Sequence, residues 1–317
     1  MIKISKLKMY AKMGSRASFG MAALELAKET DNLMVLTADV STSAGLDRYR
    51  KKYPDKFLDV GIAEQNMMGI ATGLSSEGYE VITTTFAPFQ TMRCCEQIKV
   101  NLGYMNQKVI FVGLASGIVL GELGFTHCSL EDIGVLHSIP NITIISPADC
   151  FETMKVTKAA LEHKSSVYIR LTGGSNADLV YTEDYDYEIG KAIKLKSGKD
   201  LVIIANGTMV AHSLKVCELL EQKGIDAGVI NMHTIKPIDY EAIIEASKSK
   251  FIVSIEEHNI IGGLGSAISQ VISKHKLDTK HLSIGIDDYY AKAASYEDLL
   301  VEYGLTPPQI VEKIENF

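Results

Sequence analysis

The sequence lacks a basic surplus and a long hydrophobic run, and it has no tryptophan. Lysine and arginine number 32 against 39 aspartates and glutamates, so the formal net charge is −7. Proteins that bind nucleic acids or anionic membranes normally carry an excess of positive charge. The longest apolar run, residues 109–120, is shorter than the about 20 residues that a membrane-spanning helix needs. The sequence therefore predicts neither a nucleic-acid partner nor a membrane partner.

Cysteine is also scarce, with five residues and no CxxC pair. An odd number without paired spacing argues against a zinc site and against the disulfide framework of a secreted protein. The first ten residues contain lysines but no apolar segment of the kind that a secretory signal needs. The sequence therefore predicts reduced thiols in a cytoplasmic protein and no metal site of its own.

What the sequence does contain is the composition of a soluble globular protein. Hydrophobic residues make up 46% of the chain and charged residues 22%, which excludes a disordered chain. A length of 317 residues corresponds to two domains at about 150 residues each.

Apolar runs typical of buried strands alternate with segments of helical period along the chain. Strands are predicted at 33–40, 56–61, 80–86, 109–115, 141–147, 166–171, 200–207, 226–235, 250–258 and 281–286. Helices are predicted at 17–28, 64–78, 89–104, 211–224, 239–249 and 262–275, with Asp149 as the cap of a further helix. A polar stretch at 172–188 interrupts the alternation and predicts a linker or surface hairpin. The pattern predicts a first α/β domain, residues 1–183, with a parallel sheet covered by helices on both faces, and a smaller second α/β domain, residues 184–317.

Glu64 is at the N-terminus of the predicted helix at 64–78, just after a predicted strand that ends at Gly61. One interpretation is a first-turn glutamate stabilised by the helix dipole. The surrounding segment is apolar and has no basic residue near it in sequence, which favours partial burial. A desolvated glutamate has a raised pKa and can hold a proton near neutral pH.

Three further features have both a structural and a functional interpretation. Phe86 and Phe89 follow a strand, so they are either core residues or a stacking face for a flat heterocycle. His127 lies in a loop rich in glycine and threonine, where a histidine is structural or takes part in chemistry. The glycine-rich GGLGSA at 262–267 is a weak dinucleotide fingerprint and fits better a helix N-terminus that packs closely on a sheet.

A resemblance to a known family rests on five blocks in a fixed order: LTADVSTS, DVGIAEQNMMGIATGL, TTFAPFQTMRCCEQI, GFTHCSLEDIGVLHSIPNITIISPAD and VYIRL. Together they resemble the pyrimidine-binding domain of transketolases and 1-deoxyxylulose-5-phosphate synthases. The motifs KPID and EEHNIIGGLGSA are similar to the C-terminal domain of that family. The resemblance covers about the whole chain and implies a pyrimidine-type thiamine diphosphate-binding domain followed by a transketolase C-terminal-like domain.

The family's first domain, which binds the cofactor's diphosphate through a metal-binding GDG…N motif, has no counterpart here, because the sequence contains no GDG. The resemblance therefore implies the C-terminal subunit of a split transketolase. An N-terminal-type partner subunit would supply the ligands for Mg²⁺ and the diphosphate. Because the family's sites form at dimer interfaces, the expected assembly is an α2β2 heterotetramer.

The resemblance also implies residues that contact the cofactor. Glu64 stands where the family has the carboxyl group that hydrogen-bonds the aminopyrimidine ring. Phe89 matches the aromatic residue that stacks on this ring, with Phe86 beside it. Asp39 matches a carboxylate near the cofactor and the interface, and Met92 replaces an aromatic residue common in the pocket.

On the substrate side, Arg16, Ser43 and Arg170 match family positions that bind the substrate phosphate. His127 matches a histidine that contacts substrate oxygens. Two positions depart from the family: Ala115 replaces a histidine of the phosphate site, and Leu123 replaces an aspartate that accepts a hydrogen bond from a donor hydroxyl.

These departures predict an unusual substrate for a transferase that moves a two-carbon ketol unit from a ketose or ketose phosphate to an aldehyde or ketone. One alternative is the β subunit of a 2-oxoacid dehydrogenase or decarboxylase, which shares the fold and the cofactor. Another is a catalytically silent assembly subunit. The DVGIAEQN and PAD blocks favour the transketolase over the 2-oxoacid enzyme. Retention of Glu64, Phe89, His127 and the three candidate phosphate-binding residues argues against a silent subunit.

Overall fold

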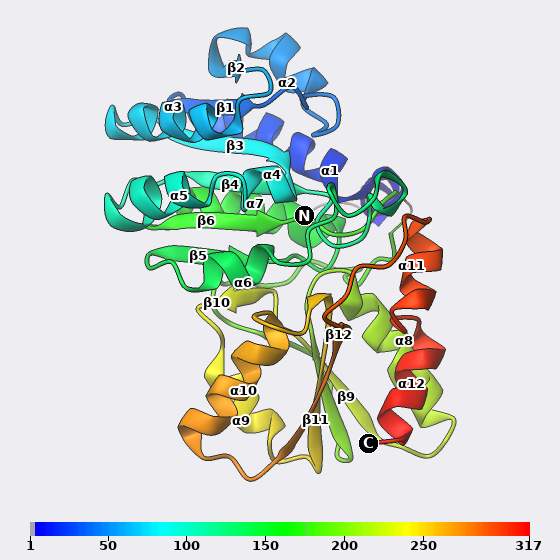
Figure 1. Cartoon of the computed structure of the whole chain (residues 1–317). Coiled ribbons are helices and arrows are strands. Elements are labelled where there is room, and N and C mark those ends of the chain that lie inside the picture. The colour runs from blue at the N-terminus through cyan, green and yellow to red at the C-terminus, as the bar shows by residue number, and fades with distance from the viewer. Residues whose placement is uncertain (1–3, 176) are drawn as a thin grey trace.

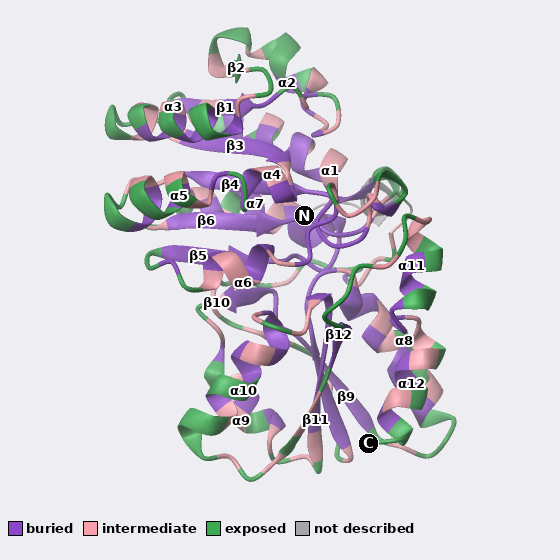
Figure 2. Ribbon diagram, in the orientation of Figure 1, coloured by how far each residue is buried: buried purple, intermediate pink, exposed green. Residues whose placement is uncertain are grey.

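The computed structural model of the chain describes residues 4–175 and 177–317. Residues 1–3, at the start of the predicted first domain, and residue 176, in the predicted linker, lie outside the described residues. The chain forms two sheets, and helices flank each of them (Figure 1). The strands are largely buried, whereas the outer faces of the helices are exposed (Figure 2). In the described part of the chain, no helix is long and apolar enough to cross a membrane.

The first sheet has seven strands in the order β10-β5-β6-β4-β3-β1-β2. Its strands are β1 (Leu33–Thr37), β2 (Phe57–Asp59), β3 (Glu80–Phe86), β4 (Ile110–Leu114), β5 (Ile142–Ile145), β6 (Ser166–Arg170) and β10 (Thr234–Lys236). Its helical elements are α1 (Ile4–Glu29), α2 (Asp47–Lys52), η1 (Pro54–Lys56), α3 (Glu64–Ser76), α4 (Ala87–Gln90), α5 (Cys95–Gln97), η2 (Ile98–Tyr104), η3 (Gly121–Leu123), α6 (Asp132–His137) and α7 (Cys150–Glu162). The sheet is buried on both faces, because Ile110 and Val112 pack with α1 while Phe111 packs with α3.

The second sheet has five strands in the order β12-β11-β8-β9-β7. These are β7 (Ile193–Lys196), β8 (Leu201–Ala205), β9 (Ala227–Asn231), β11 (Phe251–Asn259) and β12 (Lys280–Ile286). The helices are α8 (Met209–Glu221), α9 (Tyr240–Ala246), α10 (Leu264–His275), α11 (Tyr296–Glu302) and α12 (Pro307–Glu315). One face packs against α8 and α12, and the other against α9 and α10. The prediction of a two-domain α/β fold is confirmed.

The parallel sheet predicted for the first half of the chain is confirmed, with one antiparallel edge strand, β10, which pairs with β5. The second sheet is likewise parallel except at its edge, where β7 is antiparallel to β9. The range 226–235, predicted as one strand, contains β9 in the second sheet and β10 in the first. The chain changes sheets at Met232 and His233. The N–H of Met232 donates to the carbonyl of Ala205, and the carbonyl of His233 accepts from the N–H of Ser146, each at 2.8 Å. An apolar run in sequence does not show to which sheet each of its residues belongs.

The predicted helix at 89–104 is also divided, into α4, α5 and the π-helical η2. Turns at 91–94 separate α4 from α5. The strand β7 and the helices α2, α6, α11 and α12 were not predicted. Short π-helical segments such as η2 are frequent at functional sites.

The KPID motif joins the two halves of the chain. Lys236 donates from Nζ to the carbonyl of His137 at 2.9 Å. Asp239 caps α9 by accepting the N–H of Ala242 at 3.1 Å. The predicted division between residues 183 and 184 falls in the connection between β6 and β7 and stays a prediction.

Candidate functional site

An aromatic cluster forms where β3 and β4 end. Phe86 is the last residue of β3, Phe89 lies in α4, and His127 lies in the loop that follows β4. The ring centroids of Phe89 and His127 are 5.3 Å apart, and each lies 6.5 Å from that of Phe86, all with edge-to-face geometry. The fold therefore brings these three predicted site residues together at the carboxyl edge of the sheet, where open α/β sheets bind ligands.

Glu64 begins α3, and its side chain is only 4% exposed. Its Oε1 accepts a hydrogen bond from Nη1 of Arg93 at 2.7 Å. The guanidinium of Arg93 also lies over the ring of Phe89, with its central carbon 4.0 Å from the centroid. Glu64 and the aromatic cluster thus share one neighbour, Arg93.

Arg93 is a basic neighbour of Glu64 that the sequence around Glu64 does not reveal. Arg93 is 29 residues away along the sequence, and only the fold brings it to the carboxylate. Gln65 supports the contact by donating from Nε2 to the backbone carbonyl of Arg93 at 3.1 Å. The position of Arg93 four residues after Phe89, on the same predicted helix, was a usable signal that the sequence interpretation missed.

Asp39 lies in the loop after β1, is exposed, and has the left-handed backbone conformation with φ 58°. Its N–H donates to Oδ1 of Asp59 at 2.9 Å, and the N–H of Gly61 donates to the same oxygen at 3.0 Å. Asp59, which the sequence interpretation did not single out, thereby ties the loop after β1 to the turn that leads into Glu64. No hydrogen bond in the described ranges joins the Asp39 side chain to Glu64.

Arg16 and Ser43 lie on two segments that pack closely. The backbone of Gly45 is so near α1 that a Cβ on it would lie 3.0 Å from the carbonyl oxygen of Arg16. Burial lowers the pKa of Arg16, since a desolvated guanidinium is less stable in its charged form. A phosphate placed there would relieve this penalty by pairing with the cation. The predicted pairing of these two residues on one ligand stays a prediction.

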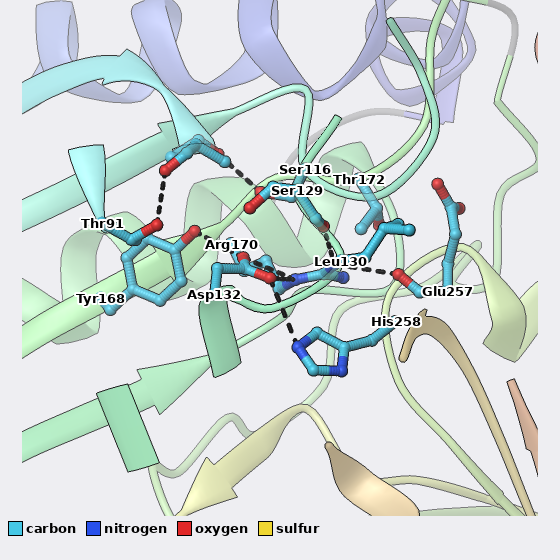
Figure 3. Close-up of polar contacts among 12 residues, drawn as sticks. Thr91, Ser116, Ser129, Leu130, Asp132, Tyr168, Arg170, Thr172, Glu257 and His258 are labelled. Atoms are coloured by element: carbon cyan, nitrogen blue, oxygen red, sulfur yellow. Dashed lines mark hydrogen bonds and ion pairs between the residues drawn. The ribbon is translucent and has the colours of Figure 1, made fainter. Parts of the chain in front are cut away.

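Arg170 is the third residue predicted to bind the substrate phosphate, and its surroundings differ from those of Arg16 and Ser43. It is fully buried, and its Nε donates to both carboxylate oxygens of Asp132 at 3.1 and 2.8 Å (Figure 3). Its Nη2 donates to the carbonyls of Ser129 at 3.1 Å and Glu257 at 2.9 Å. The hydroxyl of Tyr168 donates to the same Asp132 carboxylate at 2.7 Å. These contacts make Arg170 a connection between the two sheets.

The guanidinium of Arg170 is fully buried. A phosphate-binding role predicts instead a guanidinium that is accessible from solvent. The Nη1 of Arg170 is buried and has no hydrogen-bond partner among the described residues. A phosphate could reach this atom only if the surrounding cluster opened. The expectation that Arg170 binds a substrate phosphate stays a prediction, and the contacts present in the chain assign the residue a structural role.

Of the two basic residues near Asp132 in this buried cluster, Arg170 is charged and His258 is neutral. Burial lowers the pKa of Arg170, but the Asp132 carboxylate opposes this effect, and the net pKa is raised. Burial lowers the pKa of His258 to about 4. His258 is therefore neutral at pH 7, and its 3.7 Å approach to Asp132 is not an ion pair. The charged contact in this group is that of Arg170 with Asp132.

The GGLGSA motif has the structural role that the sequence favoured. The carboxylate of Glu256 accepts the N–H groups of Leu264 at 2.6 Å and Gly265 at 2.8 Å, at the start of α10. A Cβ on Gly263 would lie 2.1 Å from Oε2 of Glu256, so only glycine permits this approach. Burial raises the pKa of Glu256 to about 7 against the opposing effect of these two N–H groups.

The second half of the chain also supports the loop that carries His127. The N–H of Ile118 donates to Oε1 of Glu257 at 2.9 Å. The rings of Phe125 and Tyr290 pack with centroids 5.3 Å apart. Figure 1 shows the segment between β12 and α11 rising toward the first sheet. The C-terminal region therefore positions one edge of the candidate site.

Two family models match the chain in succession. "Transketolase, pyrimidine binding domain" matches residues 11–176, and "Transketolase, C-terminal domain" matches residues 190–310. The chain belongs to the transketolase family. The resemblance predicted from the sequence blocks is confirmed.

Among the relatives of this transketolase-family chain is a "Putative transketolase C-terminal section" of Methanocaldococcus jannaschii, 39% identical, with 95% of each chain covered. One subunit of an apulose-4-phosphate transketolase of Phocaeicola vulgatus is 36% identical, over 95% of this chain and 96% of the relative. The solved structure "Split gene transketolase, inactive beta4 tetramer" is 35% identical with a TM-score of 0.87, covering 96% of this chain and 97% of that one. These relatives share the two-domain length of this chain.

The residues of this transketolase-family chain fit the aminopyrimidine of thiamine diphosphate. The guanidinium of Arg93 is a flat hydrogen-bond donor, and it lies on the Phe89 ring while donating to Glu64. A flat heterocycle with ring nitrogens can make the same two kinds of contact. This geometry fits the expected cofactor-binding role of Glu64 and Phe89, which stays a prediction.

Proposed function

We propose that this chain is the C-terminal-type subunit of a split, thiamine diphosphate-dependent transketolase. It moves a two-carbon ketol unit from a ketose or ketose phosphate to an aldehyde or ketone. It acts with an N-terminal-type partner that supplies the ligands for Mg²⁺ and the diphosphate, in an α2β2 heterotetramer. The observation that carries the proposal is the buried Glu64 carboxylate beside the Phe86–Phe89–His127 cluster, on this family's fold. The five cysteines all lie within the described residues and form no disulfide, which supports a reducing, cytoplasmic location.

Each residue of the cluster has a distinct task. Thiamine diphosphate, when bound, supplies the reactive carbon that accepts the ketol unit. Glu64 holds or moves a proton at a ring nitrogen of the aminopyrimidine, and Phe89 presents its face to that ring. Thr126 Oγ1 lies 3.0 Å from Nδ1 of His127. That contact occupies one nitrogen of the imidazole and leaves Nε2 for a substrate oxygen.

The substrate is proposed to differ from that of ordinary transketolases. Leu123 is 58% exposed at the end of η3, in the same loop as His127, and cannot accept a hydrogen bond. Ala115 is fully buried with φ 50° and offers no polar group. Relatives of this type whose names specify apulose-4-phosphate support a specialised sugar. We propose an unusual ketose phosphate donor bound with the help of Arg16, Ser43 and His127.

Leu123→Asp should raise kcat/KM for ordinary ketose phosphate donors by about tenfold, because the new carboxylate accepts a hydrogen bond worth about 1–3 kcal/mol from a donor hydroxyl. The measurement is ketol transfer by the assembled enzyme with a panel of standard donors. Leu123→Ala is the matched control, since it removes the leucine without adding an acceptor. Equal rates for the two variants with every donor would refute this explanation of specificity.

Thiamine diphosphate with magnesium should bind to the chain assembled with its N-terminal-type partner but not to the chain alone. The reason is that this chain offers the aminopyrimidine side of the site, whereas the diphosphate ligands belong to the partner. The related beta4 tetramer is described as inactive, which supports this expectation. Titration calorimetry on both samples is the measurement. Tight binding by the chain alone would contradict the composite site, and binding by neither would contradict the proposed function.

A further inference from the structure

Arg93 makes both of the contacts that the cofactor's aminopyrimidine would make in this chain. Its Nη1 donates to Oε1 of Glu64 at 2.7 Å. The central carbon of its guanidinium lies over the ring of Phe89, 4.0 Å from the centroid. Both contacts are made to the residues that would hold the aminopyrimidine.

We propose that Arg93 is a placeholder that occupies the aminopyrimidine position until the cofactor enters and displaces it. This inference rests on the proposed function. The charge of Arg93 pairs with the buried Glu64 carboxylate, whose desolvation would otherwise be uncompensated. The guanidinium also covers the face of Phe89. The placeholder thus maintains the site in the absence of the cofactor.

The side chain of Arg93 can leave while its backbone stays. The side chain is 42% exposed, so it has access to solvent along one side. The backbone is held at both polar atoms, because its N–H donates to the carbonyl of Pro88 at 3.2 Å and its carbonyl accepts from Gln65 at 3.1 Å. Displacement therefore needs a change of side-chain rotamer only.

The placeholder lowers the apparent affinity for the cofactor, because only the fraction of molecules with Arg93 displaced can bind. Arg93→Met keeps an unbranched side chain but removes the charge and the flat donor. In the complex assembled with the partner subunit, this variant should bind thiamine diphosphate with magnesium about 3- to 10-fold more tightly than the unmodified complex. Titration calorimetry measures the dissociation constant without reference to catalytic activity.

Two controls separate competition from a general change of charge. Lys99→Met removes an exposed cation from the same region of the chain and should leave the affinity unchanged. Magnesium pyrophosphate, which lacks the aminopyrimidine, should bind the Arg93→Met complex and the unmodified complex equally. A gain for thiamine diphosphate alone supports the placeholder.

Equal or weaker thiamine diphosphate binding by the Arg93→Met complex would overturn the placeholder while leaving the proposed function intact. An equal gain for magnesium pyrophosphate would also overturn it, because the effect would then be electrostatic and remote from the aminopyrimidine. Absence of thiamine diphosphate binding by the unmodified complex would overturn the proposed function and this inference together.

Discussion

Replacing Glu64 by glutamine should lower the kcat of the assembled enzyme by about 10²- to 10⁴-fold, the usual contribution of a positioned proton-transfer group. Glutamine is close in size to glutamate and can still form a hydrogen bond, but it neither holds nor releases a proton at the aminopyrimidine. The loss should therefore appear in kcat far more than in the dissociation constant of thiamine diphosphate. Ketol transfer and titration calorimetry on the same preparation measure the two quantities.

Glu77→Gln is the matched control, because Glu77 is an exposed residue at the other end of α3. It should leave kcat and cofactor binding unchanged. Full activity of the Glu64→Gln complex would show that the carboxyl group is not required. That result would support the alternative of a catalytically silent subunit.

The second large effect concerns stability and the buried pair of Arg170 and Asp132. Arg170→Met should lower the free energy of unfolding by about 3–5 kcal/mol, since it leaves the Asp132 carboxylate buried with its charge uncompensated. Asp132→Leu should lower the free energy of unfolding by a similar amount, because it leaves the positive charge of Arg170 buried and uncompensated. Urea unfolding followed by circular dichroism is the measurement.

In the double variant Arg170→Met with Asp132→Leu, the free energy of unfolding should fall by clearly less than the sum of the two single decreases, because neither member of the buried ion pair remains. For comparison, Glu241→Gln breaks the ion pair with Lys191, whose side chains are 65% and 53% exposed. That substitution should lower the free energy of unfolding by less than about 1 kcal/mol. Additive losses at Arg170 and Asp132 would show that the two residues act independently, contrary to the geometry.

Much of the site could be predicted because its signals are local in sequence. Glu64 follows a strand and starts a helix, and Phe86 and Phe89 mark the end of the next strand. The structure places Phe86, Phe89 and His127 within 6.5 Å of one another, measured between ring centroids. The predicted strand at 80–86 coincides with β3. The alternation of strands and helices, visible as hydrophobic periodicity, predicts sheets that are covered by helices.

The prediction was incomplete where side chains distant in sequence meet. Nothing local to Arg170 showed that Asp132 and the carbonyl of Glu257, 38 and 87 positions away, engage its guanidinium. Arg93 was overlooked because its partner, Glu64, lies 29 positions away in the sequence. The single strand predicted at 226–235 is wrong for the same reason, since its two parts pair with different sheets.

The sequence by itself therefore determined the family and the two-domain α/β fold, and it predicted the carboxyl, aromatic and histidine groups of the candidate site. The tertiary structure alone decided which cation faces Glu64, which arginine is withdrawn from solvent, and which strand joins the two halves. The physical reason is the range of the interactions. Hydrophobic period and helix caps act over a few residues, whereas ion pairs and buried hydrogen bonds depend on which distant segments the core brings together.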